Sequence, residues 1–528
     1  MIYRASAEVI LEAPTAAAGP DHPSQAAAGD PATTGDPVPA GDVAATGDSP
    51  PPVADPPAPG ARYRRPVAVV ENLLLAAGLL VLATTPKPPM MGDGLARYQA
   101  LVQLLEQRQL PETPYSLIGP LFATPLWLVG HWYGNTQVWL AQYNLLLFVL
   151  GAGALHGLLQ DRVDARLRRR FLLLLLAGSM VAAHVPDFYG EMFTAMAVGV
   201  GLLAATVTGT GRVTRAAGWG AVVLGVANTP ASAVALAITV AVLCLHRRRV
   251  RYLLVLPATA ALILGEAWWR WGDPLHSAYA ENGGGVTVLP YSGRPGFSYP
   301  FVLGLVAILF SFGKGLAWFA PGLFLPVRRA LRPSPVGDGG AALAADPERP
   351  DAAGRTGAGP GTADLWTAWL LWSAFVGGLV LTYASWWGWN GGMYWGPRFF
   401  LVAILPASLA LAALHGPAAR TGPLLTAATL VATALSVWGA ANSRVFGQLR
   451  PWICYQDNYR LEGLCHFTPE FSPLWYPFVD PPTLAARDLL ALGFYAVVLL
   501  WLTVPLLVRL ARQVAPHARA LGPRGWHW

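Results

Sequence analysis

The stretch RLRRRFLLLLLAGSMVAAHVP (residues 166–186) decides the fold class, because a basic cluster leads directly into a long apolar run. A membrane-spanning helix needs about 20 mostly apolar residues. Basic clusters beside such helices gather on the cytoplasmic side of the membrane. The pattern recurs at residues 62–65, 247–251, 328–332 and 509–519, where short arginine clusters border other apolar runs. It predicts a polytopic membrane protein.

The composition supports the same class. Hydrophobic residues make up 54% of the chain and charged residues 12%, with a mean hydropathy of +0.42. Soluble domains carry about 25% charged residues, so the lipid bilayer must be part of this protein's solvent. The net charge of +7 does not indicate a nucleic-acid partner, because it sits in the loop clusters. Lysine occurs only at Lys87 and Lys314, whereas arginine abounds, which is typical of a high-GC bacterial genome.

These features predict an all-α protein, a polytopic transmembrane helical bundle of about 10–12 membrane segments with a helical first outer loop. With every strong arginine cluster inside, both termini are cytoplasmic and the functional surface faces outward. The predicted divisions are a disordered tail (1–65), a membrane part (66–332) with a first outer loop (86–135), a disordered cytoplasmic linker (333–364), a second membrane part (365–509) with an outer loop (442–487), and a basic tail (510–528).

The predicted spans include one interrupted stretch. Residues 218–245 are too short for two full crossings and are broken by Asn228-Thr229-Pro230, so we expect two short helices that meet inside the protein. The other predicted spans are 67–85, 136–159, 171–186, 190–208, 252–271, 299–327, 365–384, 398–414, 421–441 and 488–508.

Acids at the predicted outer boundary are candidates for chemistry. Asp93, between Gly92 and Gly94, can accept a proton or bind a cation in water beside the bilayer. The alternative is an ordinary helix-capping aspartate. Glu191 lies at the start of the span 190–208, where an ionised acid costs free energy unless it is paired with a cation or hydrated. The alternative for it is a first-turn glutamate favoured by the helix dipole.

Cations and aromatic residues lie near the same boundary. Lys314 interrupts one span, and Arg398 follows an aromatic run that ends in Trp395-Gly396-Pro397. Tryptophan beside a cation suits a sugar or a lipid phosphate. An interfacial aromatic belt explains the run equally well.

Two cysteines share the second outer loop. Cys454 and Cys465 can form a disulfide in an oxidising compartment. Two unpaired thiols remain the alternative, because sequence does not fix their geometry.

The order of these motifs resembles the GT-C type of membrane glycosyltransferase, which includes protein mannosyltransferases that use dolichyl phosphate mannose and bacterial transferases that use polyprenyl phosphate sugars. The likeness covers about residues 67–415. It is carried by Gly92-Asp93-Gly94 with Arg97-Tyr98, by Tyr189-Gly190-Glu191, by the break at Asn228-Thr229-Pro230, and by Trp395-Gly396-Pro397-Arg398. The family often has a second acid where this chain has Gly94, and a basic residue where it has Thr229.

The resemblance implies an enzyme of the cell membrane, part of a cell envelope, that moves a sugar from a polyprenyl-phosphate donor to an acceptor hydroxyl on the extracytoplasmic side. Asp93 would be the catalytic base, and a divalent cation is a possible cofactor. The implied substrate-binding residues are Glu191, Arg97, Tyr98, Lys314, Arg398 and Trp395.

Two other functions stay open. Broken helices around a cavity also mark transporters and flippases, although the chain shows no inverted repeat. A non-catalytic subunit for envelope assembly is favoured only by the departures at Gly94 and Thr229. Walker, Rossmann and zinc motifs are missing from the sequence, which weakens an ATP-driven pump.

Overall fold

The computed structural model describes residues 61–276, 286–289, 292–294, 296–332, 364–392, 394–416, 419, 421–447, 454 and 456–520. Within these ranges the chain is helical and contains no strand, which confirms the all-α class. The tail predicted to be disordered lies outside the described residues up to residue 60. The predicted linker lies outside them from 333 to 363, and so does the end of the basic tail from 521.

Seven helical stretches of the described chain are long and apolar enough to cross a membrane. They are α1 (Ala61–Ala83), α5 with α6 (Thr136–Leu140, Tyr143–Leu159), η1 with α11 (Pro230–Ser232, Ala233–Arg247), η2 with α12 (Val250–Leu254, Val255–Trp271), α17 (Leu365–Tyr383), α19 (Pro423–Val445) and α23 (Ala486–Ala520). Shorter apolar helices are α9 (Gly190–Thr206), α13 (Phe301–Phe310) and η5 with α18 (Arg398–Ala403, Ile404–Leu414). The chain is therefore a polytopic helical membrane protein, as predicted.

The remaining helices form the centre and the connections. The connecting elements are α8 (Val181–His184), α10 (Arg212–Ala227), α14 (Leu316–Phe319), η3 (Pro321–Phe324) and α15 (Arg328–Leu331). α18 is buried at every residue, and α7 (Ala165–Ala177) is buried from Arg170 to Ala177. The two pack against each other, so the apolar run that decided the fold class lies in the protein core and not against lipid.

The interrupted stretch forms two helices that part at the predicted break, but the second is not short, because η1 with α11 (Pro230–Arg247) is long enough to cross a membrane. α10 ends at Ala227 and η1 starts at Pro230, so the break falls at Asn228-Thr229. On the two sides of this break, α10 packs mainly on α9, whereas α11 packs mainly on α17. Small residues allow the α9–α10 contact. A Cβ added to Gly218 would lie only 2.8 Å from the carbonyl oxygen of Gly201. This packing places the start of α9 and the end of α10 at the same end of the bundle.

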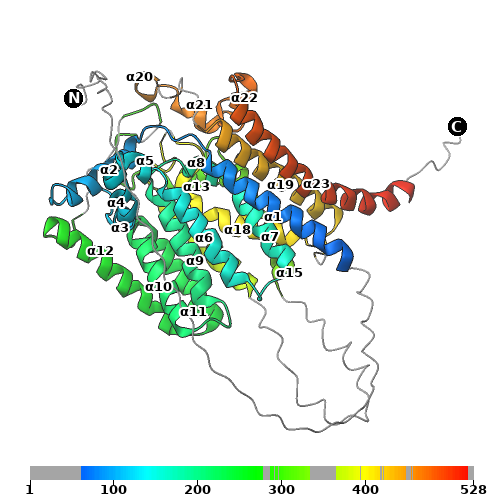
Figure 1. Ribbon diagram of the computed structural model, residues 1–528, viewed down its shortest axis with the longest axis horizontal. Helices are drawn as coiled ribbons and strands as arrows, with labels where there is room; N and C mark the ends of the chain where they lie inside the picture. The colour runs from blue at the N-terminus through cyan, green and yellow to red at the C-terminus, as the bar shows by residue number, and fades with distance from the viewer. Residues whose placement is uncertain are drawn as a thin grey trace, which may run out of the picture. The chain divides into compact units, whose positions relative to one another are not determined.

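The segment predicted to be the first outer loop is helical, as predicted. It contains α2 (Gly92–Leu105), α3 (Ile118–Phe122) and α4 (Thr124–Tyr133). The second outer loop contains α20 (Gln456–Tyr459), α21 (Glu462–Phe467), η7 (Pro469–Phe471) and α22 (Tyr476–Val479). The labels of α2 and of α20–α22 lie towards the upper edge of Figure 1, whereas α11 and α15 lie lower.

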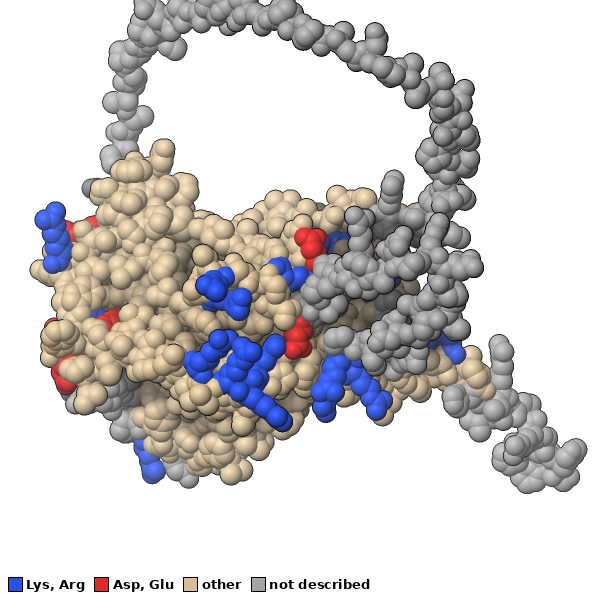
Figure 2. Space-filling model, turned by 90° about the horizontal axis from the view of Figure 1, so that it is seen from below, with Lys and Arg blue, Asp and Glu red and all other residues tan. Residues whose placement is uncertain are grey.

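Basic residues mark the lower end of the bundle. α11 ends in His246-Arg247, α15 starts with Arg328-Arg329, and α10 starts at Arg212. Figure 2, seen from below, shows lysine and arginine side chains gathered on this face with few acids among them. The face agrees with the arginine placement on which the predicted topology depends.

Candidate active site

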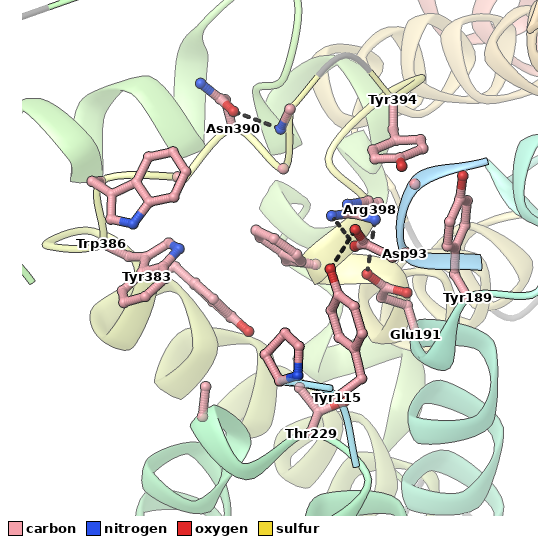
Figure 3. A pocket seen from close by; sticks show the side chains of 18 of the residues that line it. Asp93, Tyr115, Tyr189, Glu191, Thr229, Tyr383, Trp386, Asn390, Tyr394 and Arg398 are labelled. Carbon is pink, nitrogen blue, oxygen red and sulfur yellow. Dashed lines mark hydrogen bonds and ion pairs between the residues drawn. The ribbon is translucent and has the colours of Figure 1, made fainter. Parts of the chain in front are cut away.

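A cavity of about 830 Å³ lies among the elements that face the outer loops. Both outer loops, the start of α9, the break after α10 and the segment from α17 to η5 contribute to its wall. The lining residues include Asp93, Arg97, Tyr115, Ser116, Tyr189, Glu191, Asn228, Thr229, Phe297, Tyr383, Trp386, Trp387, Asn390, Tyr394, Arg398 and Glu462. Figure 3 shows ten of the lining side chains with labels, turned towards a common space.

Arg398 joins the two acids singled out in the sequence. Its Nη2 lies 2.7 Å from Oδ2 of Asp93, and its Nη1 lies 3.6 Å from Oε1 of Glu191 (Figure 3). The side chain of Arg398 is 7% exposed, that of Glu191 15% and that of Asp93 22%. Ion pairs this buried persist only with good geometry. Residues from three distant parts of the chain thus form one charged cluster at the cavity wall.

Asp93 is held as a carboxylate. Burial opposes its ionisation, but the charge of Arg398 and hydrogen bonds from Tyr115 and Arg398 hold its pKa below the usual range for aspartate. The hydroxyl of Tyr115 donates to Oδ1 at 2.6 Å. The N-cap of α2 is Met91, and Asp93 stands in the first turn. The carboxylate is thus turned towards Tyr115 and Arg398, which disfavours the capping alternative.

The glycines beside Asp93 make room for two tyrosines. Gly92 has φ +54°, and a Cβ there would lie 2.2 Å from the hydroxyl of Tyr394. A Cβ on Gly94 would lie 3.3 Å from the ring of Tyr189. The second acid found at this position in the resembled family would therefore crowd Tyr189.

Arg398 retains hydrogen-bonding capacity. Within the described part of the chain its buried Nε and Nη1 have no hydrogen-bond partner. The guanidinium carbon lies 4.1 Å from the ring centre of Tyr394 and 5.4 Å from that of Tyr189. An arginine held between rings, with two donors left over, is suited to bind an anion that enters the cavity.

Arg97 and Tyr98 have different positions. Arg97 lines the cavity, donates to the carbonyl of Ser116 at 3.3 Å, and lies 4.9 Å from the ring centre of Tyr115. Tyr98 lies outside the lining, and its hydroxyl is 2.8 Å from that of Thr136. Tyr98 therefore joins the outer loop to the start of α5.

Lys314 and Trp395 also lie behind the cavity wall. The ammonium of Lys314 donates to the carbonyls of Gly392 at 2.8 Å and Gly396 at 3.2 Å, and also to that of Tyr394. Trp395 donates from Nε1 to Asn442 at 2.8 Å. Both residues fix the segment that carries Tyr394 and Arg398, and neither lines the cavity.

Sequence analysis missed the residues that fix the other wall. Glu266 of α12 accepts hydrogen bonds from the Ser116 hydroxyl at 2.7 Å and from the Leu117 amide at 2.6 Å. Arg270 donates to the carbonyls of Tyr115 at 2.9 Å and Pro111 at 3.1 Å. An acid in the predicted apolar span 252–271 was the available signal, because such an acid needs a partner.

The break after α10 is fixed by Asn228. Its Oδ1 accepts from the amide of Gly119 at 3.0 Å, and its Nδ2 donates to the carbonyl of Gly190 at 2.9 Å. The hydroxyl of Thr229 lies 2.9 Å from that of Thr194. The break thus joins α3, α9 and α10 immediately beside Glu191.

The second outer loop contributes Glu462. A disulfide joins Cys454 and Cys465, with a Cα–Cα distance of 6.1 Å. Cys465 belongs to α21, the helix that Glu462 begins. The loop predicted to contain the cysteine pair therefore also supplies an acid to the cavity wall, which sequence analysis did not single out.

A divalent cation has little room between the two predicted acids. Arg398 already occupies the place between Asp93 and Glu191. Among the described residues there is also no group of three or more His, Cys, Asp or Glu side chains that could hold a metal ion. The arginine supplies the positive charge that a metal would bring to these carboxylates.

Comparison with known proteins gives two structures. No protein-family model and no curated protein sequence matches the chain. Crystal structures of ArnT from Cupriavidus metallidurans are similar to it, one bound to undecaprenyl phosphate and one in the apo state. The TM-scores are 0.43 and 0.44, at 15% and 13% identity, and both alignments cover 88% of this chain and 82% of ArnT. A likeness of this degree leaves the function to be argued from the chain's own residues.

Proposed function

We propose that this membrane protein is a glycosyltransferase that moves a sugar from a polyprenyl-phosphate donor to an acceptor hydroxyl on the extracytoplasmic side. The observation that carries the proposal is the charged cluster: an ionised Asp93 hydrogen-bonded to Tyr115, beside an Arg398 whose Nε has no hydrogen-bond partner in the described chain and whose Nη1 has only a long ion pair with Glu191. A base and an anion-binding group on one cavity wall are what glycosyl transfer from a phosphate requires.

In the proposed reaction the acceptor hydroxyl oxygen bonds to the anomeric carbon of the sugar. The bond from that carbon to the phosphate oxygen breaks, and the electron pair leaves with the phosphate. The hydroxyl proton passes to Asp93. Arg398 meets the charge that grows on the leaving phosphate with its guanidinium, in which Nε has no hydrogen-bond partner in the described chain and Nη1 has only the ion pair with Glu191.

Glu191 and Arg97 have supporting roles in this proposal. Glu191 shares Arg398 with Asp93, so Arg398 is still anchored when the phosphate draws it away from the base. Arg97 helps to keep the carboxyl of Asp93 ionised and stands against the ring of Tyr115. Asp93 is thus free to take a proton at the moment at which Arg398 is occupied by phosphate.

One observation favours the transporter alternative, and another favours the assembly alternative. The helix break at Asn228-Thr229 lines the cavity, as broken helices do in transporters. Thr229 pairs with Thr194 and supplies no positive charge where the resembled family often has a basic residue. Neither alternative explains why an ionised carboxylate and an arginine with donors to spare stand together at the cavity wall.

A reconstituted assay tests the proposal. Purified protein in lipid nanodiscs is incubated with a set of radiolabelled polyprenyl-phosphate sugars and a membrane extract as the acceptor source. We expect label to move to the acceptor fraction and free polyprenyl phosphate to appear. Substitution of Arg398 by lysine should mainly weaken use of the donor, because a forked guanidinium becomes a point charge.

The matched control is Arg108→Lys, at an exposed arginine of the same outer loop, which should leave transfer unchanged. Movement of intact donor across the bilayer without transfer of label would favour a flippase. Neither movement nor transfer would favour the assembly role.

A further inference from the structure

The cavity has a second end with different chemistry. Tyr383, Trp386 and Asn390 lie across the open space from Asp93, Arg398 and Glu191 (Figure 3). Trp387 and Glu462 belong to the same lining. Building on the proposed function, we propose that these five residues, Tyr383, Trp386, Trp387, Asn390 and Glu462, form a subsite for the sugar ring of the donor, with Glu462 as its specificity-determining acid.

Glu462 forms no salt bridge with a lysine or arginine in the part of the chain that the structure describes. Its side chain is only 7% exposed, and its hydrogen bonds with described residues both end on Oε1: Nδ2 of Asn390 lies at 3.3 Å and Nε2 of His466 at 3.2 Å. In the described part of the chain neither of these hydrogen bonds reaches Oε2. A buried carboxylate is costly unless its oxygens are used, and a sugar hydroxyl would supply the missing donor.

His466 does not neutralise this acid. Burial lowers the pKa of His466 below its ordinary value, so the ring is neutral around pH 7 and acts on Glu462 as a hydrogen-bond donor. At one end of the cavity Arg398 is shared by Asp93 and Glu191, and at the other Glu462 has no arginine or lysine partner within salt-bridge distance among the described residues. A sugar phosphate whose phosphate pairs with Arg398 would hold that phosphate away from Glu462, because like charges repel, and its ring would then lie towards Glu462.

The aromatic residues complete the subsite. The indole of Trp386 is held edge-on against Phe297, with ring centres 5.2 Å apart, and beside Trp387, with ring centres 5.9 Å apart. A pyranose has an apolar C–H face and a rim of hydroxyls. Flat rings with a carboxylate and an amide at their border match that pattern.

The subsite is rigid at its polar border. Oδ1 of Asn390 accepts the amide of Gly392 at 2.6 Å, which fixes the amide group. The α21 helix of Glu462 is held by the Cys454–Cys465 disulfide and by a hydrogen bond from the amide of Gly313 to the carbonyl of His466 at 3.1 Å. A polar pair fixed before the ligand arrives discriminates between hydroxyl arrangements more sharply than mobile groups do.

Lipid binding, measured without turnover, tests the subsite. The probes are undecaprenyl phosphate and the same lipid phosphate carrying mannose, glucose, galactose or arabinose, bound to the full chain in nanodiscs. At least one sugar-bearing lipid should bind about tenfold more tightly than the bare lipid phosphate. Glu462→Gln and Trp386→Ala should remove that advantage and leave binding of the bare lipid phosphate unchanged. Arg398→Gln should weaken both.

Matched controls are Glu470→Gln and Trp268→Ala, because both residues are exposed and lie outside the cavity lining. The subsite is wrong if no sugar-bearing lipid binds more tightly than the bare one. It is also wrong if Glu462→Gln keeps the advantage, or loses bare-lipid binding equally. Sugar-selective binding that depends on Glu462 without any transfer would instead overturn the proposed reaction and leave the subsite standing.

Discussion

At the scale of single residues, the proposed chemistry depends on Asp93 staying ionised although its side chain is largely buried. Burial alone would favour the neutral carboxyl. Arg398 and the hydroxyl of Tyr115 reverse that preference and hold the pKa of Asp93 below its usual range. As the proposed base, Asp93 would therefore be available throughout the neutral range, although a low pKa makes it a weak base.

Tyr115→Phe tests this balance. Loss of the 2.6 Å hydrogen bond should raise the pKa of Asp93, because burial still opposes ionisation. Activity depends on the ionised form, so the acid limb of the pH–rate profile should move to higher pH, while the rate at pH 7.5 changes little. The control Tyr133→Phe alters a tyrosine that is 79% exposed. An unmoved acid limb would show that Tyr115 does not tune the base.

Some of the site residues predicted from the sequence line the cavity and others do not, and the difference has a physical reason. Asp93, Glu191, Arg97 and Arg398 do line one cavity. Lys314 was expected at the phosphate, but its charge is taken up by backbone carbonyls that lie about 80 residues further along the chain. Sequence shows that a cation stands near the membrane boundary, and it does not show which loop folds back to cover it.

At the scale of elements, α12 acts as a clamp on the first outer loop. Glu266 and Arg270 hold the backbone of residues 111–117 through the hydrogen bonds described above. That segment carries Tyr115 to Asp93. The sequence could not reveal the contact, because Glu266 and Ser116 are separated by 150 residues.

Glu266→Gln should therefore move the acid limb of the pH–rate profile to higher pH, as Tyr115→Phe does, with little change in KM, because charge-assisted hydrogen bonds to the loop that carries Tyr115 are weakened. As a positioning residue, Glu266 acts through Tyr115. The double variant with Tyr115→Phe should then move the acid limb by less than the sum of the two single shifts. Glu106→Gln, at an exposed glutamate next to α2, is the control. Fully additive shifts would contradict the clamp.

At the scale of the whole molecule, the sequence predicted the helical class and most boundaries, because long apolar runs and arginine clusters are strong signals. It could not separate buried helices from lipid-facing ones. α7 and α18 are apolar because they form the core. The last predicted span was also too short, since α23 continues from 508 to Ala520. Helical continuation into a polar tail depends on local propensity, which hydropathy does not report.

The orientation of the bundle remains a prediction that labelling can test. In a Cys244→Ser background, cysteines are introduced in place of Arg108 and Arg212, both exposed. An impermeant maleimide applied to intact cells should label position 108 and not position 212, because the arginine clusters stay inside. Equal labelling after the membrane is permeabilised is the control. External labelling at position 212 would invert the topology and place the cavity on the cytoplasmic side.

Asp93 is the proposed base of the glycosyl transfer, and its substitution tests that role most directly. Asp93→Asn keeps the shape of the side chain and removes the base, so expression and thermal stability should stay close to those of the wild type. Transfer from labelled polyprenyl-phosphate sugar in nanodiscs should fall by about 10²–10⁴-fold. Asp480→Asn, at an exposed aspartate of the second outer loop, should have no effect. Full transfer activity in a folded Asp93→Asn protein would contradict the catalytic assignment.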